Sequence, residues 1–226
     1  MLAELEQNLK LKFKNQDLLK SAFIHRSYLN EHSEEKLPHN ERLEFLGDSV
    51  LGFVVSEHLY KKFPNHPEGD LTNFRSSLVN ARTLAEISKK LQLGKYLLLS
   101  KGEEATGGRE RQYILANTFE SLLGAIYLDC GLEAAHKLIH RELLPELDDI
   151  IQKKLYRDFK SAFQELAQEK KSITPSYRVL AEEGPDHNRT FTVGVFLDEE
   201  QIAQGVGKSK QAAEQEAAKE AIANLN

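Results

Sequence analysis

A long apolar helix that carries three carboxylates on one face stands out in the first half of this chain. The pattern runs from about Glu41 to Phe63, and the prolines at 64 and 67 end it. Glu41, Glu44 and Asp48 stand at positions i, i+3 and i+7, so at about 100° per residue they share one narrow stripe. Apolar residues cover the other side and flank the stripe: Leu43, Phe45, Leu46, Val50, Leu51, Phe53, Val54 and Val55. A helix that is apolar nearly all round is typical of the buried centre of a domain.

Carboxylates in such a place repel one another and lose hydration unless a cation compensates them. A second apolar helix, from about Tyr113 to Leu128, carries Asn117 and Glu120 at positions i and i+3. Two buried helices of this kind can cross and share a metal ion, and oxygen ligands favour Mg²⁺ or Mn²⁺ over zinc. Such cations activate water and stabilise charge in phosphodiester hydrolysis. Buried ion pairing is the alternative explanation of the same pattern.

Most of the first 150 residues are helical by pattern. A first helical segment ends near Tyr28, and further helical patterns cover residues 71–91 and 132–144. A polar segment at 30–40 is predicted to be a loop, and the glycine-rich segment 101–109 is predicted to be a flexible one.

The pattern changes after Lys153. Asp158 can cap a short amphipathic helix, three strand-like segments follow at 176–182, 189–197 and 201–207, and a last helix begins at Ser209. The order α-β-β-β-α in about seventy residues is typical of a small independent domain. We therefore predict a multidomain chain with an all-α domain at 1–148, a linker at 149–153 and a small α+β domain at 154–226.

The start of the last helix carries a second signal. Lys208 and Lys210 flank Ser209 there, and cations at a helix N-terminus oppose the helix macrodipole. The same amides and lysines form a good phosphate site. The alternative is a pair of solvated lysines in a turn. Ala213, Ala217 and Ala218 are small enough to let this helix lie close against a sheet.

Composition limits the classes of protein that fit. Cys130 is the single cysteine, so no disulfide forms within the chain, and a cytoplasmic location is expected. No apolar run is long enough to span a bilayer, so we expect no membrane partner. The net charge of −5 argues mildly against a nucleic-acid partner, but clustered basic residues outweigh net charge.

These segments resemble those of a known family. The run from Asn40 to Ser49 resembles the signature of ribonuclease III, and the segments 23–28, 68–70 and 114–129 resemble other parts of that family. The C-terminal unit resembles a double-stranded-RNA-binding domain, so the resemblance extends essentially from end to end. It implies an all-α endonuclease domain followed by an RNA-binding domain.

The resemblance implies roles for the acidic residues. Glu44, Asp48 and Glu120 match metal ligands of the family, and Asp48 and Glu120 match positions essential to hydrolysis. Glu41 and Glu68 match acidic positions that assist cleavage, although Glu68 also fits a carboxylate of a solvated turn. Asn117 stands where the family usually has aspartate. Its amide oxygen can still coordinate a cation, without the charge.

Further roles concern RNA and a second subunit. Gln164 and Glu165 match RNA-contacting positions of the first helix, His187 matches a loop that enters the minor groove, and Lys208, Ser209 and Lys210 match the phosphate contacts. Phe45 matches an aromatic side chain that inserts into the partner subunit. Ordinary core packing is the alternative for Phe45.

The resulting expectation is a homodimeric endonuclease that uses Mg²⁺, with Mn²⁺ as a possible substitute, and no organic cofactor. It would cut both strands of double-stranded RNA and leave 5′-phosphate and 3′-hydroxyl ends with short 3′ overhangs. Precursors of ribosomal RNA and structured messenger RNAs are the expected substrates. A regulator that binds duplex RNA without cleaving it, and a hydrolase of small phosphoesters, are the alternatives.

Overall fold

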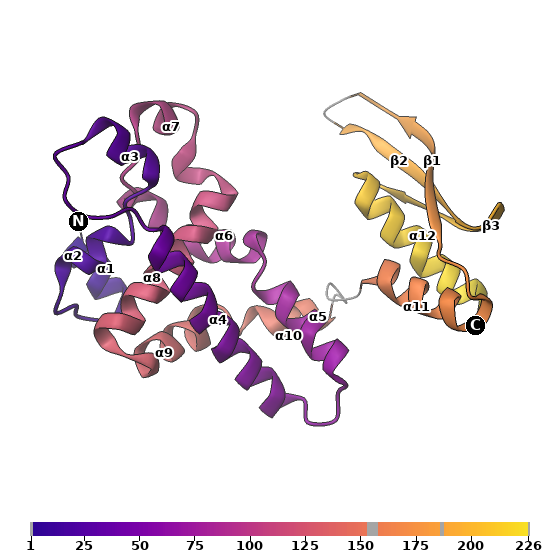
Figure 1. The fold of residues 1–226 in the computed structure, drawn as a ribbon, viewed down its shortest axis with the longest axis horizontal. Coiled ribbons are helices and arrows are strands. Elements are labelled where there is room, and N and C mark those ends of the chain that lie inside the picture. Colours follow the sequence, from indigo (N-terminus) through magenta and orange to yellow (C-terminus); the bar gives the residue numbers. More distant parts are fainter. Residues whose placement is uncertain (1, 153–157, 186–187, 226) are drawn as a thin grey trace. The chain divides into compact units, whose positions relative to one another are not determined.

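The computed structural model describes residues 2–152, 158–185 and 188–225, and the chain divides into two compact units (Figure 1). The first unit comprises residues 1–156 and the second residues 157–226. The structure differs from the predicted linker at 149–153, because helix α10 (Glu146–Gln152) continues to residue 152. Ile150 of that helix is buried in the core of the first unit, so apolar contacts hold most of this segment in the unit.

The described part of the first unit is built from helices, as predicted. Besides α10 it contains α1 (Leu2–Leu9), α2 (Gln16–Ser21), α3 (Arg26–Glu31), α4 (Glu41–Lys62), α5 (Glu68–Leu78), α6 (Ala81–Lys90), α7 (Lys101–Ala105), α8 (Gln112–Cys130) and α9 (Leu132–Glu142), with the 3₁₀ turns η1 (Leu93–Tyr96) and η2 (Gly108–Glu110).

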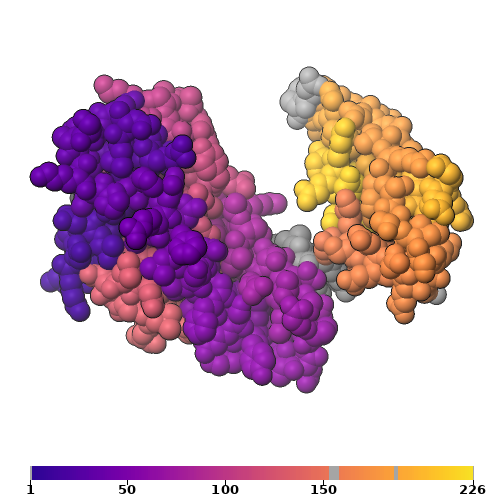
Figure 2. All heavy atoms as spheres, viewed as in Figure 1, coloured from indigo at the N-terminus to yellow at the C-terminus, as the bar shows by residue number. Residues whose placement is uncertain are grey.

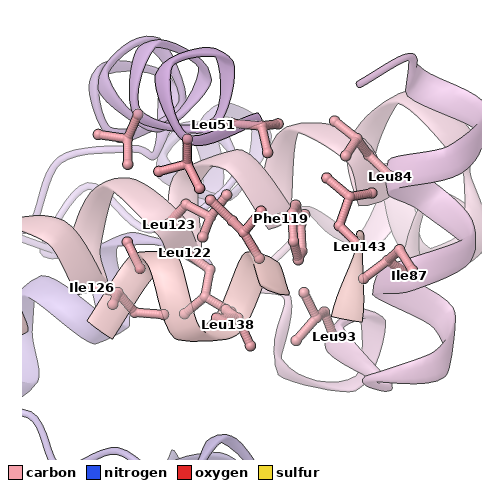
Figure 3. Close-up of a cluster of buried hydrophobic side chains, with 14 of the residues drawn as sticks. Leu51, Leu84, Ile87, Leu93, Phe119, Leu122, Leu123, Ile126, Leu138 and Leu143 are labelled. Carbon is pink, nitrogen blue, oxygen red and sulfur yellow. The ribbon is translucent and has the colours of Figure 1, made fainter. Parts of the chain in front are cut away.

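Helix α8 lies at the centre of this unit. Nearly every residue between Ile114 and Ile126 is buried, and α4, α6 and α9 pack around the helix. The close-up shows side chains from these elements converging, among them Leu51 and Phe119 (Figure 3). Each fully buried Leu or Phe side chain contributes about 1.5–3 kcal/mol relative to an exposed one, so this core stabilises the scaffold that holds α4.

Helix α4 is buried on one side only, so the prediction of a helix buried all round was wrong. Phe45 is 77% exposed, Phe53 57% and Tyr60 75%. One face of α4 packs on α8, whereas apolar side chains of the opposite face are largely exposed. Exposed apolar patches of this kind are typical of surfaces that bind another protein.

Two local features also differ from the sequence-based expectations. The pattern at 71–91 forms two helices, because Asn80 accepts a hydrogen bond from the Thr83 amide (3.0 Å) and caps α6. The segment 101–109 is ordered rather than a flexible loop. The Arg109 guanidinium donates to the carbonyls of Gly94 (3.0 Å) and Leu97 (2.8 Å), and these bonds fix the segment to η1.

The second unit has the predicted order α-β-β-β-α. It consists of α11 (Phe159–Lys171), the antiparallel strands β1 (Ser176–Glu183), β2 (Thr190–Leu197) and β3 (Glu200–Gly207) in the order β1-β2-β3, and α12 (Lys210–Leu225). Asp158 caps α11 by accepting from the Ser161 amide (3.2 Å), as expected. Both helices pack on the sheet around Phe163 and Val195. The space-filling view shows this unit in orange to yellow (Figure 2).

None of the helices in the described ranges combines the length and the apolar composition that crossing a membrane requires.

Candidate metal centre and nucleic-acid interface

Two glycines bring the backbones of α4 and α8 into contact. A Cβ atom at Gly47 would lie 1.7 Å from the carbonyl oxygen of Glu120, and one at Gly124 would lie 2.2 Å from that of Leu43. Only glycine lets the two helices approach so closely. The sequence patterns predicted that the two helices could cross, but not that Gly47 and Gly124 lie at the contact, although two glycines within buried helical patterns were a signal for it.

The crossing places the predicted ligands opposite one another. Glu44 and Asp48 flank Gly47 on α4, and Asn117 lies one turn before Glu120 on α8. Burial, followed by the negative charges of Asp48 and Glu44, raises the pKa of Glu120 to about 7. The structure therefore brings Glu44, Asp48 and Glu120 within electrostatic reach of one another.

Glu44 contacts the amide that departs from the family pattern. The pKa of Glu44 is raised, first by burial and then by the negative charges of Glu41 and Asp48. A hydrogen bond with the Asn117 side chain acts in the opposite direction and lowers this pKa. An amide NH₂ donates to a carboxylate, which a carboxylate neighbour cannot do. Asn117 thus reduces the repulsion within the group.

The donor set fits a hard divalent cation in its chemistry. Ion pairs in this region of the described chain involve Glu41 and leave Glu44, Asp48 and Glu120 without a cationic partner. The group offers three carboxylates and one amide, and oxygen atoms of these types are ligands that Mg²⁺ and Mn²⁺ prefer. In the described residues, however, no three His, Cys, Asp or Glu side chains are already placed to hold a metal ion together. The carboxylates of Glu44, Asp48 and Glu120 repel one another, and a bound cation would draw them together.

Glu41 is held at the edge of this group. It is exposed, and its carboxylate lies 3.7 Å from the Arg26 guanidinium and 3.8 Å from Nδ1 of His39. Arg26 begins α3, which is fastened nearby because the His25 amide donates to the Leu98 carbonyl (3.1 Å).

Asn40 and Ser121 connect the start of α4 to its surroundings. The Asn40 amide N–H donates to the Ile24 carbonyl (2.9 Å), and the Ser121 hydroxyl, on α8, lies 3.3 Å from the Asn40 carbonyl. Both residues are buried. These contacts fix the register between α4 and α8 on which the carboxylate group depends.

Glu68 lies apart from the other carboxylates in this chain. It begins α5, accepts a hydrogen bond from the Thr72 hydroxyl (2.7 Å), and shares a groove with Ser56 and Tyr60 of α4. Ser56 follows Asp48 by eight residues, which is about 12 Å along the helix axis. Glu68 is not among the charges that act on the pKa of Glu44 or of Glu120.

The RNA-contact residues predicted on the first helix of the second unit lie together. Gln164 and Glu165 are exposed on α11, and they line a shallow hollow with Ser161, Gln168 and Glu169. Polar side chains in a row on one helix face suit contacts to hydroxyls and base edges in a wide, shallow groove.

The start of α12 combines a cap with two exposed lysines. The Ser209 hydroxyl accepts a hydrogen bond from the Ala212 amide (3.1 Å). Lys208 donates to the side chains of Asn188 (2.9 Å) and Thr190 (3.1 Å), and Lys210 pairs with Glu182 (3.0 Å). These contacts hold both lysines beside the helix start. The predicted contact residue His187 lies outside the described residues.

Helix α12 lies against β3 as closely as its small residues allow. Ala213, Ala217 and Ala218 are fully buried, and a Cβ atom at Gly205 would lie 2.2 Å from the Ala217 nitrogen. The expected role of the alanines is therefore confirmed. The close packing fixes the direction in which the start of α12 presents Ser209 and its lysines.

Both units match families of known proteins. A model of ribonuclease-III-like proteins matches residues 15–147, and a model of the double-stranded RNA binding motif matches residues 159–225. The chain belongs to the ribonuclease III family. The family is generally divalent-metal-dependent, which agrees with the oxygen donors at the α4–α8 crossing.

Individual members of the ribonuclease III family match over nearly the full length. The chain is 48% identical to Ribonuclease 3 of Carboxydothermus hydrogenoformans, over 98% of this chain and 94% of the relative. It is 42% identical to Ribonuclease 3 of Streptococcus equi subsp. zooepidemicus, over 99% and 97%. The first unit resembles the nuclease domain of ribonuclease III from Campylobacter jejuni, with a TM-score of 0.58 and 42% identity, over 62% of this chain and 94% of that domain.

Proposed function

We propose that this chain is an endonuclease that hydrolyses phosphodiesters in both strands of double-stranded RNA. The observation that carries the proposal is the α4–α8 crossing, which gathers Glu44, Asp48 and Glu120 in a chain that also contains a double-stranded-RNA-binding motif. The motif supplies a duplex-binding surface, and the carboxylates supply the chemistry of a hydrolytic site. A hydrolase of small phosphoesters would need no such motif.

The residues Glu44, Asp48, Asn117 and Glu120 would hold the cation, which we propose is Mg²⁺ with Mn²⁺ as a substitute. When bound, the cation supplies Lewis acidity and a nucleophilic water. The carboxylates of Asp48 and Glu120 would position it, and Glu44, hydrogen-bonded to Asn117, would help to balance its charge. Glu41 and Glu68 are proposed to assist at the RNA. The expected products carry 5′-phosphate and 3′-hydroxyl ends with short 3′ overhangs.

The exposed apolar face of α4 supports a homodimer. Phe45 lies beside a hollow of about 680 Å³, also lined by Pro38, His39, Leu46 and Leu128. A neighbouring hollow on the same helix, lined by Phe53 and Tyr60, also contains Glu68. The similar Campylobacter jejuni structure is described as flexible in a region involved in dimer formation. We propose that Phe45 of each subunit enters the other, so that two acidic groups face the two strands of one duplex.

The second unit is proposed to bind the duplex through its backbone and minor groove. Gln164 and Glu165 would contact sugar hydroxyls and base edges, and Lys208, Ser209 and Lys210 would contact phosphates, with His187 in the minor groove. Precursors of ribosomal RNA and structured messenger RNAs in the cytoplasm are the proposed substrates.

The test is cleavage of an end-labelled RNA hairpin by the wild type and by Glu120→Gln, with and without Mg²⁺, beside a binding measurement. We expect the wild type to cut both strands with short 3′ overhangs, and only with the cation. Glu120→Gln should lose at least a hundredfold in cleavage rate and retain duplex affinity. Glu133→Gln, an exposed carboxylate on α9, serves as the control and should cleave normally. Wild-type cleavage by Glu120→Gln would overturn the assignment of the site.

One observation favours a second function. Asn117 removes one negative charge from the donor set and reduces the attraction for a cation. If the wild type binds duplex RNA but cuts it in neither Mg²⁺ nor Mn²⁺, the chain is a duplex-binding regulator instead.

A further inference from the structure

Three histidine side chains lie together where α9 packs on α4, on a part of the nuclease unit that its proposed function does not use. The rings of His136 and His140, one turn apart on α9, stack with centroids 4.3 Å apart. The ring of His58 on α4 meets His140 edge-on, with centroids 5.1 Å apart. His140 thus lies between the other two and joins the two helices.

The charged groups around these rings come from α4 and α10. On α4, the Glu57 carboxylate lies 3.7 Å from Nε2 of His136 and is also paired with Lys61 (2.7 Å). Lys62, also on α4, is paired with Asp148 of α10 (2.8 Å), and both of these charges act on His58. His136 therefore has a carboxylate neighbour. His58 and His140 have no such partner among the described residues.

The surroundings of His58 and His140 oppose a positive charge on either ring. Burial, the charge of His140 and that of Lys62 lower the pKa of His58. His140 is largely exposed; partial desolvation and the charge of His136 lower its pKa, and Glu57 offsets this in part. Positive charges on the neighbouring rings of His58 and His140 would repel one another, so this packing favours their neutral forms.

We propose that His58 and His140 form a pH-sensitive contact, in which their neutral imidazoles hold α9 against α4 and protonation of either ring weakens this packing. A histidine whose pKa is lowered by folding binds protons more tightly in the unfolded chain. Its contribution to stability is therefore fully present above the ordinary pKa of 6.5 and is lost as the pH falls below it. Because α4 also carries Glu44 and Asp48, acidification would loosen the scaffold of the catalytic group from its far end.

The test uses the whole chain and measures two properties, the titration of its histidines and its thermal stability. NMR titration of the histidine side chains should show His58 and His140 gaining protons below pH 6.5. Melting of the nuclease unit is followed from pH 7.5 to 5.5 in the wild type, in the double variant His58→Gln/His140→Gln, and in the control His66→Gln, whose histidine lies outside the contact. The wild type and the control should lose about 2–4 °C more than the double variant over this range.

Other titrating groups, Glu120 among them, affect all three proteins equally, so the difference between their melting profiles isolates the histidines. Parallel profiles for the wild type and the double variant would overturn the proposal. Titration of His58 and His140 at or above pH 6.5 would also overturn it. This measurement needs only the wild type, so it decides the matter if the double variant does not fold. Because cleavage is not the readout, failure here would leave the proposed nuclease function standing.

Discussion

At the scale of single residues, the environment determines the chemistry of the acidic group. Glu133 and Glu120 have the same side chain, but Glu133 lies exposed on α9 whereas Glu120 is half-buried beside Asp48 and Glu44. Burial removes hydration, and the neighbouring carboxylates add repulsion, so the charged form of Glu120 is disfavoured. A cation would relieve both effects, which makes the stability of the metal-free protein a sensitive measure of the site.

We predict that Glu120→Gln stabilises the metal-free protein at pH 8. The folded-state pKa of about 7 lies above the ordinary 4.5, so folding favours the protonated carboxyl. The stability that this form contributes is fully present below about pH 4.5 and is lost as the pH rises through 7. With allowance for screening by solvent, the variant should gain about 1 kcal/mol at pH 8 and nothing at pH 4.5.

Thermal melting in a chelator at several pH values provides this measurement. Glu133→Gln should follow the wild type at every pH. The quantity to compare is the difference in stability between Glu120→Gln and the wild type. If this difference is the same at pH 8 and at pH 4.5, Glu120 is not electrostatically strained.

At the scale of helices, the approach of α4 to α8 decides whether the carboxylates meet. The amphipathic patterns indicate that both helices are partly buried, but they do not give the distance between them. That distance depends on Gly47 and Gly124, where the two backbones touch. In the second unit, Gly205 has the same role between β3 and α12, so both candidate sites depend on a glycine at a close approach.

We predict opposite effects for two glycine substitutions in α4. A methyl group at Gly47 would meet the Glu120 carbonyl at 1.7 Å, so Gly47→Ala should lower the free energy of unfolding by about 3 kcal/mol or more. Gly52 has nothing within 4 Å of its Cβ position, so Gly52→Ala should raise it by about 0.5–1 kcal/mol through the better helix propensity of alanine.

Denaturant unfolding of both variants tests the crossing. Cleavage by Gly47→Ala should fall as well, because Asp48 is the next residue on the helix. Equal stability of the two variants would show that the α4–α8 contact tolerates a larger separation.

At the scale of the whole molecule, the two units have separate cores. The buried cluster around α8 includes residues only up to Ile150, and the cluster between the sheet and its helices begins at Phe163. The exposed apolar face of α4 belongs to the first unit, and the proposed RNA contacts belong to the second.

We predict that Phe45→Ala weakens the proposed dimer. Burial of a phenylalanine side chain contributes about 1.5–3 kcal/mol, and a twofold interface contains it twice, so the dissociation constant should rise about a hundredfold or more. Sedimentation over a range of concentrations measures this. Leu180→Ala, which removes a side chain that is 44% exposed in the second unit, is the control. An unchanged dissociation constant for Phe45→Ala would place the interface elsewhere.

Local and periodic features could be predicted from the sequence. The spacing of Glu41, Glu44 and Asp48 predicts one helix face, Asp158 predicts a helix start, and the change of pattern after Lys153 predicts a second domain. Each depends on backbone periodicity or on hydrogen bonds between near neighbours, so a few consecutive residues determine it.

Features that depend on distant residues required the tertiary structure. These are the contact of Gly47 with Gly124, the separation of Glu68 from the other carboxylates, the exposure of Phe45 and the edge-on contact of His58 with His140. A pattern indicates which face of a helix is apolar, but not whether a neighbouring helix or a second subunit covers it. The distance between two helices follows from how all their side chains pack together, and no single segment of the sequence contains that information.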